Sequence, residues 1–220
     1  MSGPGAALLV IAKSPLAGRV KTRLCPPCTP QQAADIAAAA LMDTLDAAAR
    51  SRPPRLVLVL DGPAGAWVHP GAEVLPQRGG GLDERIANAF EDVGCPALLI
   101  GMDTPQVTPA ALGESAALLM ADDVDAVLGR AEDGGFWAVG LRCADRRAFV
   151  GVPMSEAFTG RAQEDRLATL GLRVAPLPVL RDVDDAHDAV AVAAAAPGGR
   201  FASAVSSALD RGLAVRGGRL

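Results

Sequence analysis

The stretch Ala97-Leu-Leu-Ile-Gly-Met-Asp-Thr-Pro105 says most about the fold, because it joins a short apolar run to a turn. The run has the length and composition of a buried strand, and its glycine and proline end it. Thr108 and Pro109 follow as a helix start, with a hydroxyl cap before a proline at the first helical position. The segment therefore predicts a strand, a loop and a helix in succession.

The same alternation extends over the rest of the chain. Further strands are expected at residues 7–12, 56–60, 74–75, 126–128, 136–141 and 172–178. Helices are expected after Thr29, from 82 to 92, from 160 to 170, before 196 and up to Asp210, with a loose tail at 211–220. This order predicts a single-domain, doubly wound α/β fold with a mainly parallel sheet flanked by helices. That domain would span residues 1–196, with a C-terminal helix and tail at 197–220.

Composition excludes several classes of function. Half of the 220 residues are hydrophobic, which is enough for a sizeable core. The net charge is −4, aromatic residues make up 3% and tyrosine is absent, so neither nucleic acid nor an anionic membrane is an expected partner. No apolar run approaches the roughly 20 residues of a membrane span. Without a basic segment at its start the chain shows no signal peptide, and we expect a cytoplasmic protein.

Cysteine and histidine do not point to a site. Cys25-Pro-Pro-Cys28 has CxxC spacing, but there is no second pair, and a closed zinc site needs four ligands. The pair also does not open a helix behind a strand, as a thioredoxin-like motif would. Ordinary thiols are expected here and at Cys95 and Cys143. His69 and His187 have no evident nucleophile partner, so we expect both at the surface.

The first candidate site is a basic loop after the first strand. Lys13-Ser-Pro-Leu-Ala-Gly18-Arg19-Val-Lys21-Thr-Arg23 holds both lysines of the chain. A lysine is a flexible point charge that can follow a phosphate, whereas arginine prefers flat, two-pronged partners. The loop therefore predicts an anion pocket for nucleotide phosphates, with a solvated surface loop as the alternative.

Asp103 is the second candidate, because it directly follows a buried strand. In doubly wound sheets ligands bind at the carboxyl ends of the strands. Magnesium takes one or two protein carboxylates and completes its shell with water and phosphate oxygens. We predict Asp103 as a metal ligand, with an Asx turn before the next helix as the alternative.

Asp182-Val-Asp184-Asp185 places alternate carboxylates on one side of an extended segment before a helix. One of them is expected to cap that helix, since aspartate suits the N-cap and the helix dipole. Three acids exceed the needs of one cap. Asp182 or Asp184 is therefore predicted to supply a second metal ligand.

Two glycine-containing turns complete the set. Asp133-Gly134-Gly135 joins a carboxylate to residues that let backbone approach a ligand, although a hairpin turn explains the same letters. Gly79-Gly80-Gly81, followed by Arg85 and Asn88 on a helix, suits a nucleobase or ribose, with a flexible linker as the alternative. The chain has no GxxxxGK[ST] or spaced GxGxxG motif, so a P-loop or dinucleotide fold is not expected.

Together these motifs resemble nucleotide-diphospho-sugar-transferase-like proteins of the selenodomain-associated transferase type. The matching segments are 12–24, 101–105, 132–136 and 182–185, and Gln77 and Leu82-Asp-Glu-Arg85 also fit. The similarity extends over about residues 7–195. The basic loop also looks like that of 2-phospholactate guanylyltransferase, and Gly80 to Arg85 is loosely similar to the base-binding stretch of sugar-alcohol cytidylyltransferases.

The resemblance implies the GT-A-type α/β fold, which glycosyltransferases and nucleotidyltransferases share. We expect a nucleotidyltransferase that uses Mg²⁺ or Mn²⁺ to transfer NMP from a nucleoside triphosphate to a small phosphorylated or anionic acceptor. In-line attack on the α-phosphate would release pyrophosphate, with fixed cations and the metal supplying most of the stabilisation. Lys21, Arg23 and Asp103 are the expected catalytic residues, and Lys13, Gly18 and Arg19 are expected to bind the triphosphate beside the two cations. Gln77, Gly80 and Arg85 are expected near the base, and Asp133, Gly134 and Gly135 near the acceptor.

Two other functions are compatible with the sequence. A GT-A glycosyltransferase using a nucleotide-diphosphate sugar needs the same metal and diphosphate contacts, so the carboxylates do not separate it from a nucleotidyltransferase. The basic loop favours the triphosphate, which carries more charge. A nucleotide-binding module without turnover is the third reading. The sequence predicts neither the nucleobase nor the oligomeric state.

Overall fold

A computed structural model describes residues 5–94 and 96–217, with side chains through Leu209. The strands are β1 (Ala7–Lys13), β2 (Leu56–Asp61), β3 (Glu73–Pro76), β4 (Ala97–Gly101), β5 (Ala126–Ala131), β6 (Phe136–Leu141) and β7 (Val174–Leu180). They form one seven-stranded sheet in the order β3-β2-β1-β4-β6-β5-β7. Every predicted strand is present, with shifted ends at β5 and β7.

The sheet is mainly parallel, as the sequence predicts. β1 pairs in parallel with β2 and β4, β2 with β3, and β5 with β7. β6 is the exception, because it runs antiparallel to both β4 and β5. The short turn between β5 and β6 explains this direction, since a parallel connection needs a crossover of a dozen or more residues.

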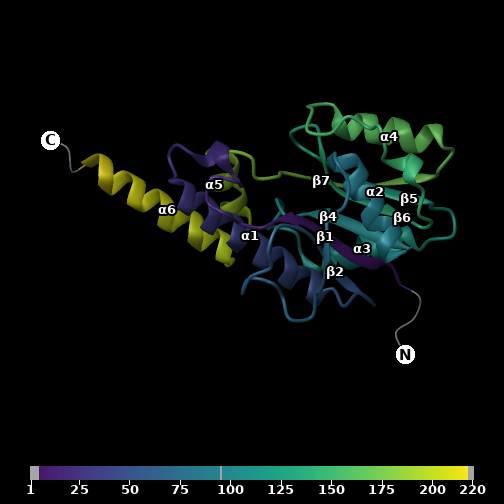
Figure 1. Cartoon of the computed structure of the whole chain (residues 1–220), viewed down its shortest axis with the longest axis horizontal. Helices are drawn as coiled ribbons and strands as arrows, with labels where there is room; N and C mark the ends of the chain where they lie inside the picture. The colour runs from purple at the N-terminus through teal and green to yellow at the C-terminus, as the bar shows by residue number, and fades with distance from the viewer. Residues whose placement is uncertain (1–4, 95, 218–220) are drawn as a thin grey trace.

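Helices cover both faces of the sheet (Figure 1). They are α1 (Pro30–Arg50), α2 (Leu82–Val93), α3 (Pro109–Leu119), α4 (Thr159–Thr169), α5 (Ala186–Ala195) and α6 (Arg200–Gly217), with short 3₁₀ turns η1 (Thr22–Leu24) and η2 (Arg146–Ala148). α1 and α3 pack with one core cluster, and α2 and α4 with another. None of the helices within the described residues is long and apolar enough to cross a membrane.

Local signals in the sequence explain where helices begin. The Thr29 hydroxyl accepts from the Gln32 N–H at 3.2 Å, and the Gln32 amide oxygen accepts from the Thr29 N–H at 2.8 Å. This capping box satisfies two donors at the start of α1. Thr108 caps α3 in a similar way, accepting from the Ala111 N–H at 3.1 Å. Both starts fall where the sequence predicts them.

The C-terminal helix is longer than the sequence predicts. α6 continues to Gly217, so the helical backbone includes most of the stretch predicted as a loose tail after Asp210. Residues 218–220 of that predicted tail lie outside the described residues. α5 and α6 sit at the end of the molecule away from α4 (Figure 1). There α6 buries Phe201 and Val205 in a third core cluster, together with Ile36 of α1.

Asp43 of α1 accepts hydrogen bonds from the start of α6 and so links the two helices. Its carboxylate accepts from the Phe201 N–H at 2.8 Å and from Arg200 Nη1 at 3.2 Å. We expect Asp43→Ala to lower the free energy of unfolding by about 1–2 kcal/mol, because it removes a cap and leaves a backbone donor without its partner. Urea unfolding measures this, with Asp35→Ala on an exposed face of α1 as the control. Equal losses in the two variants would refute the anchoring role.

Candidate functional site

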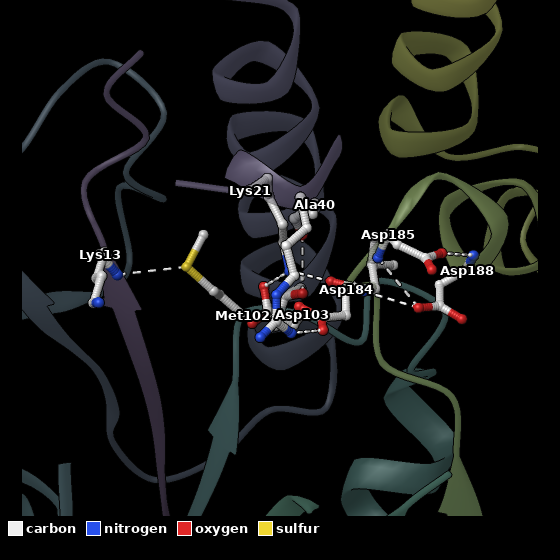
Figure 2. A network of polar contacts seen from close by, with 11 residues as sticks. Lys13, Lys21, Ala40, Met102, Asp103, Asp184, Asp185 and Asp188 are labelled. Atoms are coloured by element: carbon white, nitrogen blue, oxygen red, sulfur yellow. Dashed lines mark hydrogen bonds and ion pairs between the residues drawn. The ribbon is translucent and has the colours of Figure 1, made fainter. Parts of the chain in front are cut away.

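The basic loop and the acidic motifs meet at the carboxyl ends of the parallel strands. Lys21 Nζ lies 2.5 Å from Asp103 Oδ1, just beyond β4. The same ammonium donates a hydrogen bond to the Val183 carbonyl, and the Val183 N–H donates to the Asp103 carbonyl at 2.9 Å. Figure 2 shows the Lys21 side chain reaching Asp103, with Asp184 beside them. The expected proximity of Lys21 and Asp103 is therefore confirmed.

The Lys21 side chain is unusually enclosed for a lysine, with 9% of its surface exposed. Its backbone has φ 48°, a left-handed conformation that few non-glycine residues adopt. This turn directs the chain into η1, where the Leu24 N–H donates to the Lys21 carbonyl at 2.9 Å. The loop conformation therefore points an ammonium inward, towards the strand ends.

Arg23 forms an ion pair with Asp184. Unlike the Lys21 pair, this one is open to solvent, with 74% of the arginine side chain exposed. An exposed pair of this kind contributes little to stability, because water screens it. Both side chains are therefore available to a ligand at small cost.

A cavity of about 920 Å³ lies at this edge of the sheet. It is lined by most of the predicted site residues: Lys13, Arg19, Lys21, Arg23, Gln77, Gly80, Arg85, Asp103, Asp133, Gly135, Asp182 and Asp184. Gly18 and Gly134 are the two predicted residues outside this lining. A volume of this size accommodates a nucleotide with a further small molecule.

Several carboxylates line the cavity and act on one another electrostatically. The pKa of Asp182 is raised to about 6, mainly by burial and then by the negative charge of Asp133. Asp103 raises it further, while the Asp182 backbone N–H and the Lys21 ammonium oppose the shift. Negative charges held this close favour a bound cation.

The donor set suits magnesium bound together with phosphate. Among the described residues, no group of three or more His, Cys, Asp and Glu side chains is arranged to hold a metal ion by itself. Asp103 Oδ1 is nevertheless a buried oxygen without a hydrogen bond of good geometry; its close contact is the ion pair with Lys21. One or two such carboxylates are what Mg²⁺ takes from a protein when phosphates and water complete its shell. Asp103 and Asp182 fit that role.

The raised pKa of Asp182 predicts a pH-dependent stability. The folded protein holds this proton more tightly than the unfolded chain, so stability is lost as pH rises from about 4 to 6. Without metal at pH 8, Asp182→Asn is expected to be more stable than the parent by on the order of 2 kcal/mol. Near pH 4 this advantage should vanish. Urea unfolding in EDTA measures the difference, and parallel pH profiles of the two proteins would contradict it.

One of the acids near Asp182 is structural. Asp185 caps α5 by accepting from the N–H groups of His187 and Asp188, at 2.8 and 3.0 Å. This matches the expectation that one acid of the segment is a helix cap. Asp182 and Asp184 line the cavity instead.

At the predicted base-binding end, the Gln77 side chain is fully hydrogen-bonded within the protein. Its Nε2 donates to the carbonyls of Ala12 and Val59 at 2.8 and 3.1 Å, and its Oε1 accepts from Arg85 at 3.2 Å. Arg85 also pairs with Asp61 at 2.9 Å. Gln77 therefore positions Arg85, and Arg85 is the better placed of the two for a base.

The glycines near the cavity make contacts within the protein. The Gly80 N–H donates to Glu84 Oε2 at 2.7 Å. Asp133-Gly134-Gly135 forms the hairpin turn between β5 and β6, and Asp133 Oδ1 accepts from the Gly135 N–H at 2.7 Å. Gly134 has φ 93°, and a Cβ there would lie 1.8 Å from the Ala157 carbonyl oxygen. Gly134 is required for backbone packing, and it is not among the residues that line the cavity.

Asn88, suggested beside the base, is also engaged within the protein. Its Nδ2 donates to the Arg78 carbonyl at 2.6 Å, and its Oδ1 accepts from Arg146.

Among the described residues, Cys25, Cys28 and Cys143 are free thiols. Burial, followed by the nearby Cys25, raises the pKa of the Cys28 thiol. Cys95 lies outside the described residues.

One wall of the cavity has no counterpart in the sequence prediction. The segment between η2 and α4 contributes Met154, Ser155, Glu156 and Ala157, and α4 contributes its first residue, Thr159. The segment lacks a periodic pattern or a recognisable motif. Its place is set by long-range contacts, such as the bond from the Gly160 N–H to the Gly134 carbonyl at 2.7 Å. Thr104, which is 1% exposed, also lines the cavity. In the sequence, only its position next to Asp103 indicates that it belongs to the site.

Comparison with solved structures places the fold among transferases. A protein from Desulfovibrio desulfuricans G20, described as a candidate nucleotide-diphospho-sugar transferase, is 28% identical over 84% of this chain and 85% of its own, with a TM-score of 0.77. CMP:2-keto-3-deoxy-manno-octonic acid synthetase, solved with CTP, has a TM-score of 0.57 at 12% identity, covering 87% and 98% of the two chains. Rv0371C from Mycobacterium tuberculosis H37Rv, solved with manganese, has a TM-score of 0.51 at 22% identity, with the same two coverages.

The expected fold type is confirmed by these similarities. The two structures below 25% identity support the fold alone. A search of the curated proteins found no significant match. Residues 28–156, more than half of the chain, match the family described as "Uncharacterized protein conserved in bacteria (DUF2064)". The chain therefore belongs to the DUF2064 family.

Proposed function

We propose that the protein is a magnesium-dependent nucleotidyltransferase that moves NMP from a nucleoside triphosphate to a small acceptor and releases pyrophosphate. The observation that carries this proposal is the meeting of Lys21 and Asp103 in one large cavity. Cations of the N-terminal loop and carboxylates from two later strand ends line the same space. Triphosphate and a divalent metal need that combination of charges.

The loop cations bind and orient the polyphosphate. Lys21 and Arg23 would exchange their present carboxylate partners for phosphate oxygens, with Lys13 and Arg19 beside them in the lining. Fixed positive charges near the phosphates stabilise the charge that develops during in-line displacement. Enclosure strengthens this effect for Lys21, because a shielded charge interacts more strongly than a solvated one.

The carboxylates provide the other half of the site. Asp103 and Asp182 would hold the divalent ion, with Asp184 as the alternative second ligand. Bound there, Mg²⁺ or Mn²⁺ supplies Lewis-acid neutralisation of phosphate charge. Arg85, held by Gln77 and Asp61, would contact the base. Asp133 and the 154–159 segment would line the acceptor end, where a phosphorylated or anionic acceptor needs charge balance from the loop cations.

A glycosyltransferase that uses a nucleotide-diphosphate sugar is the second candidate. The observation favouring it is the 28% identity with the Desulfovibrio protein described in those terms. It would use the same metal and diphosphate contacts. A nucleotide-binding module without turnover is the third candidate, and it would show metal-dependent binding but no product with any acceptor.

Ligand-dependent thermal unfolding distinguishes the candidates. The protein is titrated with each of the four nucleoside triphosphates and with common nucleotide-diphosphate sugars, each with magnesium and with EDTA. Stabilisation by a triphosphate with magnesium supports nucleotidyl transfer, since a ligand raises stability in proportion to ln(1 + [L]/Kd). Stabilisation by a nucleotide sugar alone favours glycosyl transfer. No response to any nucleotide overturns both.

A further inference from the structure

The Lys21 ammonium occupies the kind of position that a hard metal cation would take. It contacts a carboxylate oxygen, Asp103 Oδ1 at 2.5 Å, and a backbone carbonyl oxygen, that of Val183. Carboxylate and carbonyl oxygens are the usual protein ligands of hard divalent cations. The Lys21 side chain is only 9% exposed, and both Asp103 Oδ1 and Val183 are buried, although the Asp103 side chain as a whole is 44% exposed.

The two segments that carry these oxygens are joined independently of the lysine. The Val183 N–H donates to the Asp103 carbonyl at 2.9 Å, which joins the two backbone segments directly. The capped start of α5 fixes the segment after Val183 through Asp185. Movement of Lys21 would therefore leave the two backbone segments joined, with the Val183 carbonyl and the Asp103 side chain on neighbouring positions.

The residue next to Asp103 carries a buried hydroxyl without a hydrogen-bond partner among the described residues. It is Thr104 Oγ1, and Thr104 is 1% exposed in the cavity lining. A buried hydroxyl without a partner is costly. The hydroxyl and the buried Asp103 Oδ1, whose close contact is the Lys21 ammonium, together indicate a ligand position at this end of the cavity.

We propose that Lys21 masks the divalent-cation site in the free protein and releases it only when a polyphosphate offers the ammonium another partner. This inference rests on the proposed function, because it assigns the metal to Asp103. Lys21 and the metal then exclude one another at the same oxygens. The metal enters with the polyphosphate, and each increases the affinity for the other.

Metal binding without nucleotide tests the mask. Mn²⁺ is titrated into the nucleotide-free protein and followed by electron paramagnetic resonance of the free ion. Lys21→Met, which keeps the aliphatic stem, is expected to bind Mn²⁺ at least about tenfold more tightly than the parent. The double variant Lys21→Met with Asp103→Asn should lose that gain.

Arg19→Met is the matched control, because it removes one positive charge from the same loop and the same cavity lining. Its Mn²⁺ affinity should stay within about threefold of the parent. Arg19 is exposed and contacts neither oxygen of the pair, so salt in the solvent screens its charge. Equal affinity of the parent and Lys21→Met overturns the proposal. So does an equal gain in Arg19→Met, because general charge would then explain the effect.

Lysine labelling tests the same inference without a change at position 21. Lys13 and Lys21 are the two lysines of the chain, and Lys13 is exposed. Acetylation followed by mass spectrometry should modify Lys13 quickly and Lys21 at least about tenfold more slowly, with Mg²⁺ alone changing neither rate. Asp103→Asn should speed the labelling of Lys21 only. Equal rates for the two lysines in the parent overturn the mask.

The two proposals fail in different ways. If nucleotides bind with magnesium but Lys21→Met leaves Mn²⁺ affinity unchanged, the mask is wrong and the proposed function stands. If no nucleotide binds and Lys21→Met still raises Mn²⁺ affinity, the masked site stands and nucleotidyl transfer is wrong.

Discussion

Asp103→Asn is expected to remove the magnesium-dependent part of nucleotide binding, weakening affinity by about 100-fold or more. Asparagine keeps the size of the side chain but loses the negative charge that Asp103 presents to a cation and to Lys21. Removing one partner of a charge pair whose contacting oxygen is buried costs about 2–5 kcal/mol, which corresponds to this range. Calorimetric titration of the tightest-binding triphosphate, with magnesium and with EDTA, measures the effect.

Asp185→Asn is the control for this loss. Asparagine caps helices about as well as aspartate, so α5 should remain intact while a nearby negative charge disappears. Its nucleotide affinity should match that of the parent. Comparison of Asp182→Asn with Asp184→Asn then identifies the second metal ligand, which we expect to be Asp182. An unchanged magnesium dependence in Asp103→Asn would exclude Asp103 as a ligand.

Lys21→Met is expected to weaken triphosphate binding by about 100-fold, even though it strengthens the binding of free metal. The ammonium lies in an enclosed position, where a charge interacts with phosphate more strongly than at the surface. Removing it also leaves Asp103 without its present partner. Calorimetry with the triphosphate and magnesium gives the affinity, and urea unfolding shows whether the variant still folds.

Lys13→Met provides the comparison, because it removes the other lysine from the same cavity lining. Lys13 is exposed, so its loss should weaken binding by about tenfold at most. Similar losses in the two variants would mean that the cavity attracts phosphate through general charge. In that case the inward conformation of Lys21 would have no special role.

Much of the fold follows from local patterns. The apolar runs at β1, β2 and β4 have the length of buried strands, and the Thr29 and Thr108 caps mark the starts of α1 and α3. These features depend on neighbours within a few residues, which is why sequence alone predicts them. The antiparallel direction of β6 follows from the short turn after β5, where the sequence offered a hairpin as one of two interpretations. The helix α6 continues to Gly217, where the sequence was interpreted as a loose tail.

The residues of the candidate site also fall into those that local sequence identifies and those that it does not. Residues that directly follow a strand, such as Asp103, could be identified because the carboxyl edge of a parallel sheet is where ligands bind. The amide of Gln77 and the backbone of Gly134 were assigned to ligands, yet both contact other parts of the protein. Their surroundings come from segments far apart in the chain, which periodicity and turn chemistry do not encode.

By itself the sequence determined the order of strands and helices, the caps, and the set of charged residues at strand ends. Only the tertiary structure decided which of those charges meet. Lys21 reaches Asp103 because its left-handed backbone turns the loop inward and because β1 and β4 are neighbours in the sheet. The physical reason is range: backbone preference and burial act over a few residues, whereas an ion pair depends on how the whole chain packs.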